Sequence, residues 1–188
     1  MDFQLSDDQL AIQDAVAKFF QEEWNSDIRR DALDDGPVKI SDEIWQQIVE
    51  MGWIGIAVSE EHGGSGLELL TAAMLAEEGG QVLFPSKLCT AFTTAFALDQ
   101  CQSGDTAALL TDHMTGQQFV SLAVDEANGT FGPENNATAA TLAGDGGTIS
   151  GEKILVPDAE CADWFLVAVR LNDSGALVKV AADAPGLT

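Results

Sequence analysis

The sequence predicts an α+β protein in which an all-helical domain is followed by a domain of short β-strands. Up to Gly116, apolar residues recur at three- and four-residue spacing behind capping residues, which is the period of an α-helix. After Gly116, short β-favouring runs alternate with turn residues, a pattern typical of a β-sandwich or barrel. With 188 residues, 46% of them hydrophobic, the chain has room for two small domains. We therefore place an all-helical domain at residues 1–116 and an incomplete β domain at residues 117–188.

The first predicted helix begins after Ser6 and extends to about Trp24. Ser6 is a capping residue, and it is followed by two acidic residues and then by a glutamine at the capping-box position. The stretch 34–37 contains Gly and Pro, which break the helical pattern. Six apolar residues form one face of this helix: Leu10, Ala11, Ala15, Val16, Phe19 and Phe20.

Four more helices are predicted before Gly116. The second starts at Ser41 and ends at Gly52, and the third spans 67–78, with Gly79 and Gly80 as its C-terminal stop. The fourth spans 87–98 and the fifth 105–114. Small residues on the fourth helix either pack closely against other helices or form the wall of a ligand cavity. Phe92 and Phe96 on this helix are therefore candidate substrate-lining residues and are equally suited to the core.

Six strands are predicted after Gly116, at residues 119–124, 137–142, 148–149, 153–156, 164–169 and 177–181. The run 164–169 is continuously apolar. We expect it to pair with 177–181 across the turn at 172–175.

The chain is strongly acidic, with eight basic and 31 acidic residues and a formal net charge of −23. Such a charge argues against binding to nucleic acid. An acidic surface would attract basic partners at low salt. Solubility in a salty environment is the alternative that we favour, because salt screens the repulsion.

The sequence carries no sign of export or of a metal site. No apolar run approaches the roughly 18 residues that a membrane span needs, and the N-terminus lacks a secretory signal pattern. Cys89, Cys101 and Cys161 are widely spaced, which predicts reduced thiols in the cytoplasm. The two histidines lie far apart in the sequence, so no metal is expected.

Three glycines, Gly63, Gly64 and Gly66, precede the third predicted helix. Backbone N–H groups at a helix N-terminus attract anions, so a phosphate-binding loop is one interpretation. No Lys-Ser/Thr pair follows and no long apolar strand precedes these glycines, so neither common nucleotide-binding fingerprint is met. We favour a structural turn with positive φ.

Three runs in the same order resemble the acyl-CoA dehydrogenase family. VSEEHGGSGL (58–67) is similar to the family's Pro-Glu-x-x-Gly-Gly-x-Gly turn, with Ser59 in place of the proline. SGEKILVPDAECADWFLVAVR (150–170) is similar to the family's Gly-x-Lys, flavin-facing strand and Ala-Asp-x-x-x-Val segment. VKVAADAPGLT (178–188) is similar to the strand that leads into an Asp-x-Pro-Gly turn.

The resemblance implies an FAD-dependent oxidoreductase of fatty acid or lipid catabolism that desaturates an acyl-CoA thioester between its α and β carbons. The α-hydrogen would leave as a proton to a carboxylate base and the β-hydrogen as a hydride to the flavin N5. Such a reaction needs a base within hydrogen-bond reach and a polarised thioester carbonyl. Electrons would pass to an electron-transfer flavoprotein, and the subunits would form homo- or hetero-oligomers, either dimers or tetramers.

The same resemblance assigns candidate binding residues. Val124 and Asp125 lie where the family's Leu-Thr pair binds the flavin pyrimidine edge, so that Asp125 replaces a threonine. Gly129 and Thr130 fall near a Gly-Ser pair that serves the pyrophosphate or the CoA chain. Leu155, Val156 and Pro157 lie where the family has an aromatic-Ile-Thr run against the ring, but Pro157 has neither the hydroxyl nor the N–H.

The resemblance places the catalytic glutamate in a C-terminal helical domain beyond Thr188, so no residue of this chain is assigned as the base. We expect the sequence to be a fragment of a longer subunit, with a shortened relative as the alternative. A second function remains open, because unequal paired subunits occur in the family. This chain would then be a non-catalytic or flavin-poor subunit that binds acyl-CoA or its catalytic partner. Flavin-dependent oxygen chemistry on a substrate without CoA is a third and less favoured function.

Overall fold

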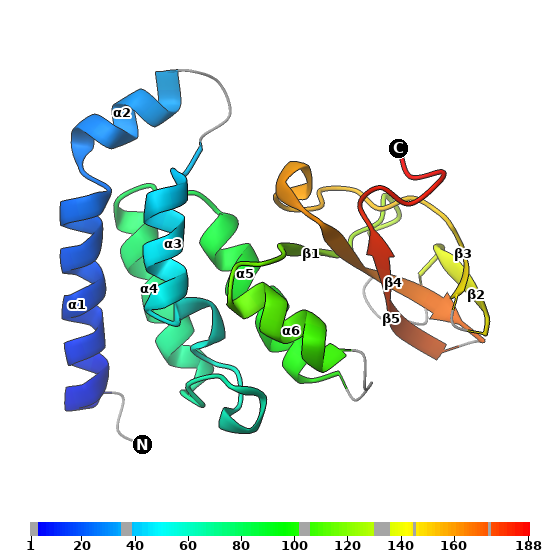
Figure 1. Cartoon of the computed structure of the whole chain (residues 1–188), viewed down its shortest axis with the longest axis horizontal. Coiled ribbons are helices and arrows are strands. Elements are labelled where there is room, and N and C mark those ends of the chain that lie inside the picture. Colours follow the sequence, from blue (N-terminus) through cyan, green and yellow to red (C-terminus); the bar gives the residue numbers. More distant parts are fainter. Residues whose placement is uncertain (1–3, 35–38, 102–105, 130–135, 145, 173) are drawn as a thin grey trace. The chain divides into compact units, whose positions relative to one another are not determined.

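A computed structural model of the chain describes residues 4–34, 39–101, 106–129, 136–144, 146–172 and 174–188. The chain forms two compact units, Met1–Gly116 and Gln117–Thr188 (Figure 1). The described elements of the first unit are helical, and all described strands belong to the second. The predicted α+β class, with helices first, is therefore confirmed.

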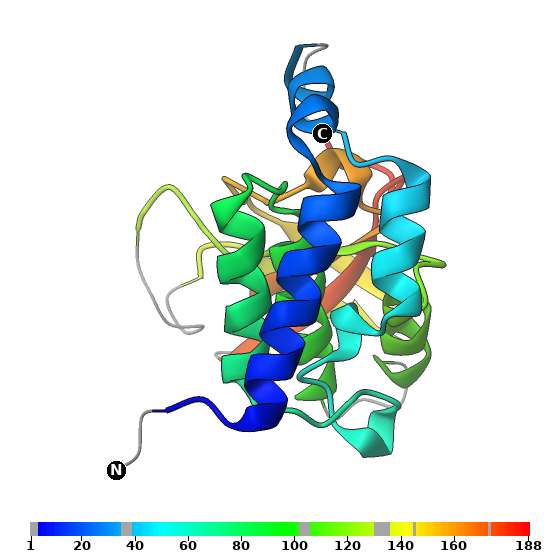
Figure 2. The ribbon, with the colours of Figure 1, turned by 90° about the vertical axis from the view of Figure 1, so that its left-hand side faces the viewer.

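The helical unit is built in three layers. In this unit α1 forms the outer layer, α3 and α4 lie behind it, and α5 and α6 form the third layer (Figure 1 and Figure 2). Two short 3-10 turns, η1 (Trp53–Gly55) and η2 (Glu60–His62), connect α3 to α4. The helices among the described residues are α1 (Asp7–Glu23), α2 (Ser26–Asp34), α3 (Asp42–Glu50), α4 (Leu69–Gln81), α5 (Lys87–Asp99) and α6 (Thr106–Met114).

The start of α1 is the predicted capping box. The Gln9 N–H donates to Ser6 Oγ at 3.2 Å, and the Ser6 N–H donates to Gln9 Oε1 at 2.9 Å. The helix ends at Glu23, with Trp24 as its C-cap, as predicted. Because the first N–H groups of a helix have no partner inside it, such a cap stabilises the helix by about 1 kcal/mol.

An aromatic cluster forms the centre of the helical core. Phe20 and Trp24 of α1 are buried. Phe84, which follows α4, contacts both, with ring centroids 4.9 and 5.1 Å apart. Trp53 of η1 lies 5.8 Å from Phe20. Ring pairs of this kind contribute about 0.5–1.5 kcal/mol each beyond the buried area, so the cluster fastens α1 to the rest of the unit.

The predicted helix stop at Gly79 and Gly80 is wrong, because α4 continues to Gln81. Gly79 is buried, and a Cβ atom at this position would lie 3.5 Å from side-chain atoms of both Phe20 and Phe84. Packing against the aromatic cluster therefore favours a small residue here, and the glycine does not mark a helix end.

Helix α2 (Ser26–Asp34) was not predicted. Its sequence, SDIRRDALD, has too few apolar residues to display a helical period. Asn25 begins the helix, because its Oδ1 accepts hydrogen bonds from the N–H groups of Asp27 and Ile28 at 3.1 and 3.2 Å. A local cap thus marks the start of this helix.

The second unit contains a mixed sheet of five described strands arranged around β4 (Figure 1). Strand β1 pairs with β4 in parallel, with Val120 beside Trp164, and β5 pairs with β4 in antiparallel orientation, as predicted. Strand β2 meets β4 at Ala139 and forms an antiparallel pair with β3. The strands are β1 (Val120–Ala123), β2 (Ala139–Ala143), β3 (Gly146–Ser150), β4 (Trp164–Leu171) and β5 (Ser174–Ala181).

The predicted strand at 153–156 is wrong, because this segment is irregular. Leu155 has φ of 52°, in the left-handed region that no strand residue adopts. The segment bonds to the loop after β1, where the Ile154 N–H donates to the Asp125 carbonyl at 3.0 Å. Loop-to-loop bonding therefore replaces strand pairing here.

Candidate functional site

Two loops that carry most of the predicted cofactor-binding residues meet at the end of β1. The first loop, 124–129, follows β1 directly, and the second, 151–158, precedes β4. The Ile154 N–H bonds to the Asp125 carbonyl, and the Lys153 ammonium donates to the Val124 carbonyl at 3.2 Å. Ser121 of β1 donates its hydroxyl to the Pro157 carbonyl. The structure therefore brings Val124 and Asp125 beside the segment 155–157.

A buried ion pair joins the two loops. Lys153 Nζ lies 2.7 Å from Glu126 Oε1, and the two side chains are only 7% and 6% exposed. Lys153 Nζ also donates to Asn136 Oδ1 at 3.3 Å. The ammonium is therefore bonded to three oxygens, which offsets the cost of removing its charge from water.

The Glu126 carboxylate is saturated with donors. It accepts from the backbone N–H groups of Ala137 at 2.7 Å and Thr138 at 3.0 Å, in addition to Lys153. Burial raises the pKa of Glu126, but the bonds from Lys153, Thr138 and Ala137 outweigh it and lower the pKa to about 2. Glu126 is therefore ionised at every ordinary pH and is a weak base.

The second loop approaches β2 closely. A Cβ atom on Gly151 would lie 2.5 Å from Thr138 Cα, so only glycine allows the backbone to pass here. Gly151 thus explains the glycine of the Gly-x-Lys motif in physical terms: it lets Lys153 reach Glu126.

Four backbone N–H groups at this site have no hydrogen-bond acceptor among the described residues; they belong to Asp125, Glu126, Leu155 and Val156. Backbone N–H groups are strong donors and bind either water or a ligand atom when they lack an intramolecular partner. Leu155 adds an apolar side chain that is 83% exposed, on a backbone in the strained left-handed region. The two loops therefore carry backbone donors and an exposed apolar side chain, both of which suit a partly apolar ligand that accepts hydrogen bonds.

The remaining candidates of the first loop are exposed. The Asp125 carboxylate has no hydrogen bond or ion pair among the described residues. Gly129 closes a tight turn, with its N–H donating to the Glu126 carbonyl at 3.0 Å. Thr130 lies outside the described residues.

Phe92 and Phe96 belong to α5, in the helical unit. Phe92 is buried in the core, with 6% of its surface exposed, and Phe96 is half-buried. Four small residues of α5 are likewise buried, which supports close packing, whereas Thr93 is exposed; the four are Thr90, Ala91, Thr94 and Ala95. Phe96 is thus the more accessible of the two substrate-lining candidates.

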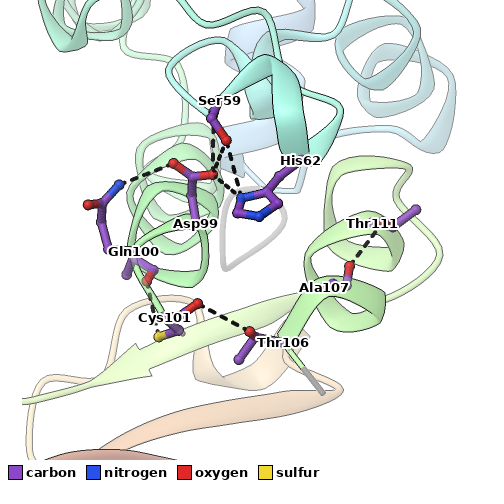
Figure 3. A network of polar contacts seen from close by, with 9 residues as sticks. Ser59, His62, Asp99, Gln100, Cys101, Thr106, Ala107 and Thr111 are labelled. Atoms are coloured by element: carbon purple, nitrogen blue, oxygen red, sulfur yellow. Dashed lines mark hydrogen bonds and ion pairs between the residues drawn. The ribbon is translucent and has the colours of Figure 1, made fainter. Parts of the chain in front are cut away.

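The glycine-rich turn 58–67 carries a polar network that the sequence did not reveal (Figure 3). The Ser59 hydroxyl donates to Asp99 Oδ1 at 2.7 Å, and the Ser59 N–H donates to the same oxygen at 3.3 Å. His62 Nδ1 lies 2.7 Å from this oxygen. Burial raises the pKa of Asp99, but hydrogen bonds from His62 and Ser59 lower it below its usual 3.8.

This network contains a Ser, a His and an Asp but is not a nucleophilic triad. In a triad, serine bonds the imidazole nitrogen opposite the one that faces the carboxylate. Here Ser59 Oγ and Asp99 Oδ1 both lie next to His62 Nδ1, at 3.2 and 2.7 Å. The network instead fastens the turn to the end of α5, and it explains Ser59, because proline would supply neither of the two donors.

The glycines of this turn are structural. A Cβ atom on Gly64 would lie 2.3 Å from the Val58 carbonyl oxygen. Gly63 has φ of 85°, as the predicted turn requires.

Several other kinds of site find no support. No group of three or more His, Cys, Asp or Glu within the described ranges could hold a metal ion. Helices in the part of the chain that the structure describes are too short or too polar to cross a membrane. The three cysteines are free thiols.

Comparison with known proteins identifies the family. Residues 6–108 match the family model "Acyl-CoA dehydrogenase, N-terminal domain". This chain is therefore a member of the acyl-CoA dehydrogenase family, and the predicted resemblance is confirmed.

Individual relatives agree with this assignment. The chain is 29% identical to benzylmalonyl-CoA dehydrogenase of Aromatoleum aromaticum, over 100% of this chain and 51% of the relative. It is 30% identical to the short-chain specific acyl-CoA dehydrogenase of Clostridium acetobutylicum, over 89% of this chain and 44% of the relative. A solved variant of the Tcur3481–Tcur3483 steroid ACAD is similar with a TM-score of 0.82 at 27% identity, over 95% of this chain and 49% of that one. The chain thus spans about half the length of the relatives that it matches.

Proposed function

We propose that this chain supplies the helical domain and the β domain of an FAD-dependent acyl-CoA dehydrogenase, which forms an α,β double bond in an acyl-CoA thioester. Family membership supports the reaction class. The observation that carries the proposal is the meeting of loops 124–129 and 151–158 at the end of β1, where four N–H groups have no acceptor within the described part of the chain. A protein of the same fold, PigA, has been solved as an FAD complex.

The residues at this site fit a flavin. The N–H groups of Asp125 and Glu126 would donate to electronegative atoms at the pyrimidine edge, and those of Leu155 and Val156 to other polar atoms of the ring. Leu155 would also contact the ring through its apolar side chain. Val124 would lie beside them, and Gly129 and Thr130 would follow towards the pyrophosphate or the CoA chain. FAD, when bound, supplies the acceptor for the hydride that leaves the β-carbon. Fixed backbone donors need no reorganisation as charge develops on a bound acceptor.

We assign the catalytic base to no residue of this chain. The base must accept the α-proton, and therefore needs a carboxylate that is free and within hydrogen-bond reach of the substrate. Glu126 belongs to the loop that carries the proposed ring site but is bonded to Lys153, with a pKa of about 2. Glu78 is buried and bonded to Gln13 at 2.8 Å. A glutamate from a C-terminal helical domain remains the proposed base.

The proposed partners follow from the same reaction. Acyl-CoA is the substrate, with Phe96 and then Phe92 as candidate lining residues, and an electron-transfer flavoprotein receives the electrons. We also propose a homo- or hetero-oligomeric assembly and a cytoplasmic location. The free thiols of the three cysteines are compatible with that compartment.

Two residues favour a second candidate, a flavin-poor subunit paired with a catalytic one. An exposed carboxylate at Asp125 would disfavour negative charge on a reduced ring nearby. Pro157 offers no N–H to the ring. A solved neighbour with the same fold is described as the ChsE4–ChsE5 complex from Mycobacterium tuberculosis.

Anaerobic mixing of the purified native protein with acyl-CoA tests the proposal. A dehydrogenase would lose its visible flavin absorbance, and mass spectrometry would detect an enoyl-CoA two hydrogens lighter than the substrate. A colourless protein that copurifies with a related flavoprotein subunit would support the second candidate. A yellow protein that acyl-CoA leaves unchanged would contradict both.

A further inference from the structure

The Glu126–Lys153 pair lies where three separate segments of the second unit meet. Lys153 belongs to the loop before β4, and Glu126 follows β1, 27 residues earlier in the chain. The segment before β2 contributes Asn136 to the ammonium and the Ala137 N–H to the carboxylate. The pair is therefore the connection that these three segments share.

A buried ion pair is a costly way to obtain stability alone. Replacing such a pair with uncharged groups of similar size is often neutral or stabilising, because desolvation offsets the attraction. Because both side chains are almost completely buried, we look for a role of the pair in positioning the surrounding backbone.

Lys153 determines the direction of the Asp125 N–H. In a planar trans peptide, the carbonyl of one residue and the N–H of the next point in opposite directions. Since the Val124 carbonyl bonds to Lys153, the Asp125 N–H is directed away from the ammonium. The Asp125 carbonyl bonds in turn to the Ile154 N–H, so the Glu126 N–H is directed away from the second loop.

We propose that Glu126 and Lys153 are positioning residues of the ring-binding site: Glu126 fixes the ammonium, and the ammonium fixes the peptide planes that present the donors of Asp125 and Glu126. This inference rests on the proposed function, because it assumes that those donors bind FAD. Neither side chain touches the ring in this account; both act through the backbone.

The test compares a double variant, Glu126→Gln with Lys153→Met, with the unchanged native protein and with two controls. The double variant removes both charges, so its stability should remain close to that of the native protein. The controls are Lys179→Met and Glu160→Gln, which remove the same charges from exposed positions in the same unit. Lys179 lies on β5, outside both loops, and contacts the Trp164 ring.

We expect the double variant to bind FAD at least tenfold more weakly, with the controls unchanged. Amide exchange at Ile154, measured without FAD, should be at least tenfold faster. The hydrogen bond from the Ile154 N–H to the Asp125 carbonyl would no longer be accompanied by the Lys153–Val124 bond between the same two loops. A stable double variant with native FAD affinity and native exchange at Ile154 would overturn the inference. If this double variant does not fold, a second one that also removes both charges, Glu126→Gln with Lys153→Gln, is read by the same two criteria.

Failure of the proposed function would look different. Native protein that does not bind FAD at all would contradict the function, while exchange at Ile154 in the FAD-free variants would still decide whether the pair orders the loops. Slow exchange at Ile154 in the double variant would then overturn the positioning role on its own.

Discussion

Removal of the Ser59 hydroxyl should destabilise the helical unit measurably. Ser59 Oγ donates to Asp99 Oδ1 at 2.7 Å, and the Asp99 side chain is only 7% exposed. Ser59→Ala removes this donor and leaves the backbone N–H and His62 as the other partners of that oxygen. Water replaces the lost donor poorly at a buried carboxylate, so the loss is larger than for an exposed serine.

The magnitude follows from the geometry. A hydrogen bond to a charged group contributes about 1.5–3 kcal/mol, and because two donors remain we expect Ser59→Ala to lower the free energy of unfolding by about 2 kcal/mol. For a chain of this length, that loss lowers the melting temperature by about 4–8 °C. Urea denaturation followed by tryptophan fluorescence measures the change.

Ser65→Ala is the matched control. Ser65 lies in the same turn and is exposed, and its hydroxyl has no hydrogen-bond partner among the described residues. Its loss should change the free energy of unfolding by less than about 0.5 kcal/mol. Equal stabilities of the Ser59→Ala and Ser65→Ala proteins would refute the assignment of a structural role to the Ser59–Asp99 bond.

Three further outcomes are expected. Thr94→Val should raise the free energy of unfolding by about 1 kcal/mol in urea denaturation, because the buried Thr94 hydroxyl has no hydrogen-bond partner in the described ranges; a loss of stability would contradict this. Gly64→Ala should cost about 1–3 kcal/mol in thermal denaturation, since the added methyl overlaps the Val58 carbonyl, whereas unchanged stability and flavin content would show that the turn tolerates a side chain. Glu126 should stabilise the fold fully above about pH 4.5 and lose this contribution as pH falls towards 2, because folding lowers its pKa to about 2. Acid unfolding followed by circular dichroism should therefore be steeper in the native protein than in Glu126→Gln.

The sequence predicted those elements of the fold that have a local signal. The capping box of Ser6 and Gln9 predicts the start of α1, and the apolar run 164–169 predicts the central strand β4. Signals that depend on packing were misread: Gly79 resembles a helix stop, but it lies against the aromatic cluster inside α4. Helix α2 has too few apolar residues to show a helical period, so the capping residue Asn25 is its one sequence signal.

The candidate site was predictable only through family resemblance. Resemblance named Val124, Asp125 and the segment 155–157, but no periodicity indicates that these loops meet. The Glu126–Lys153 pair was missed because its two members are 27 residues apart in the sequence. Glutamate and lysine are also common on protein surfaces, so neither residue type indicates a buried pair. The left-handed backbone of Leu155 likewise has no sequence signal, since leucine rarely adopts that conformation.

Titration of the flavin-free native protein with FAD tests the central claim most directly, because binding at the end of β1 underlies both the proposed reaction and the role of the ion pair. We predict saturable, stoichiometric binding that quenches flavin fluorescence and protects the Ile154 amide from exchange. A folded native protein that leaves FAD fluorescence unchanged at every concentration would contradict the account.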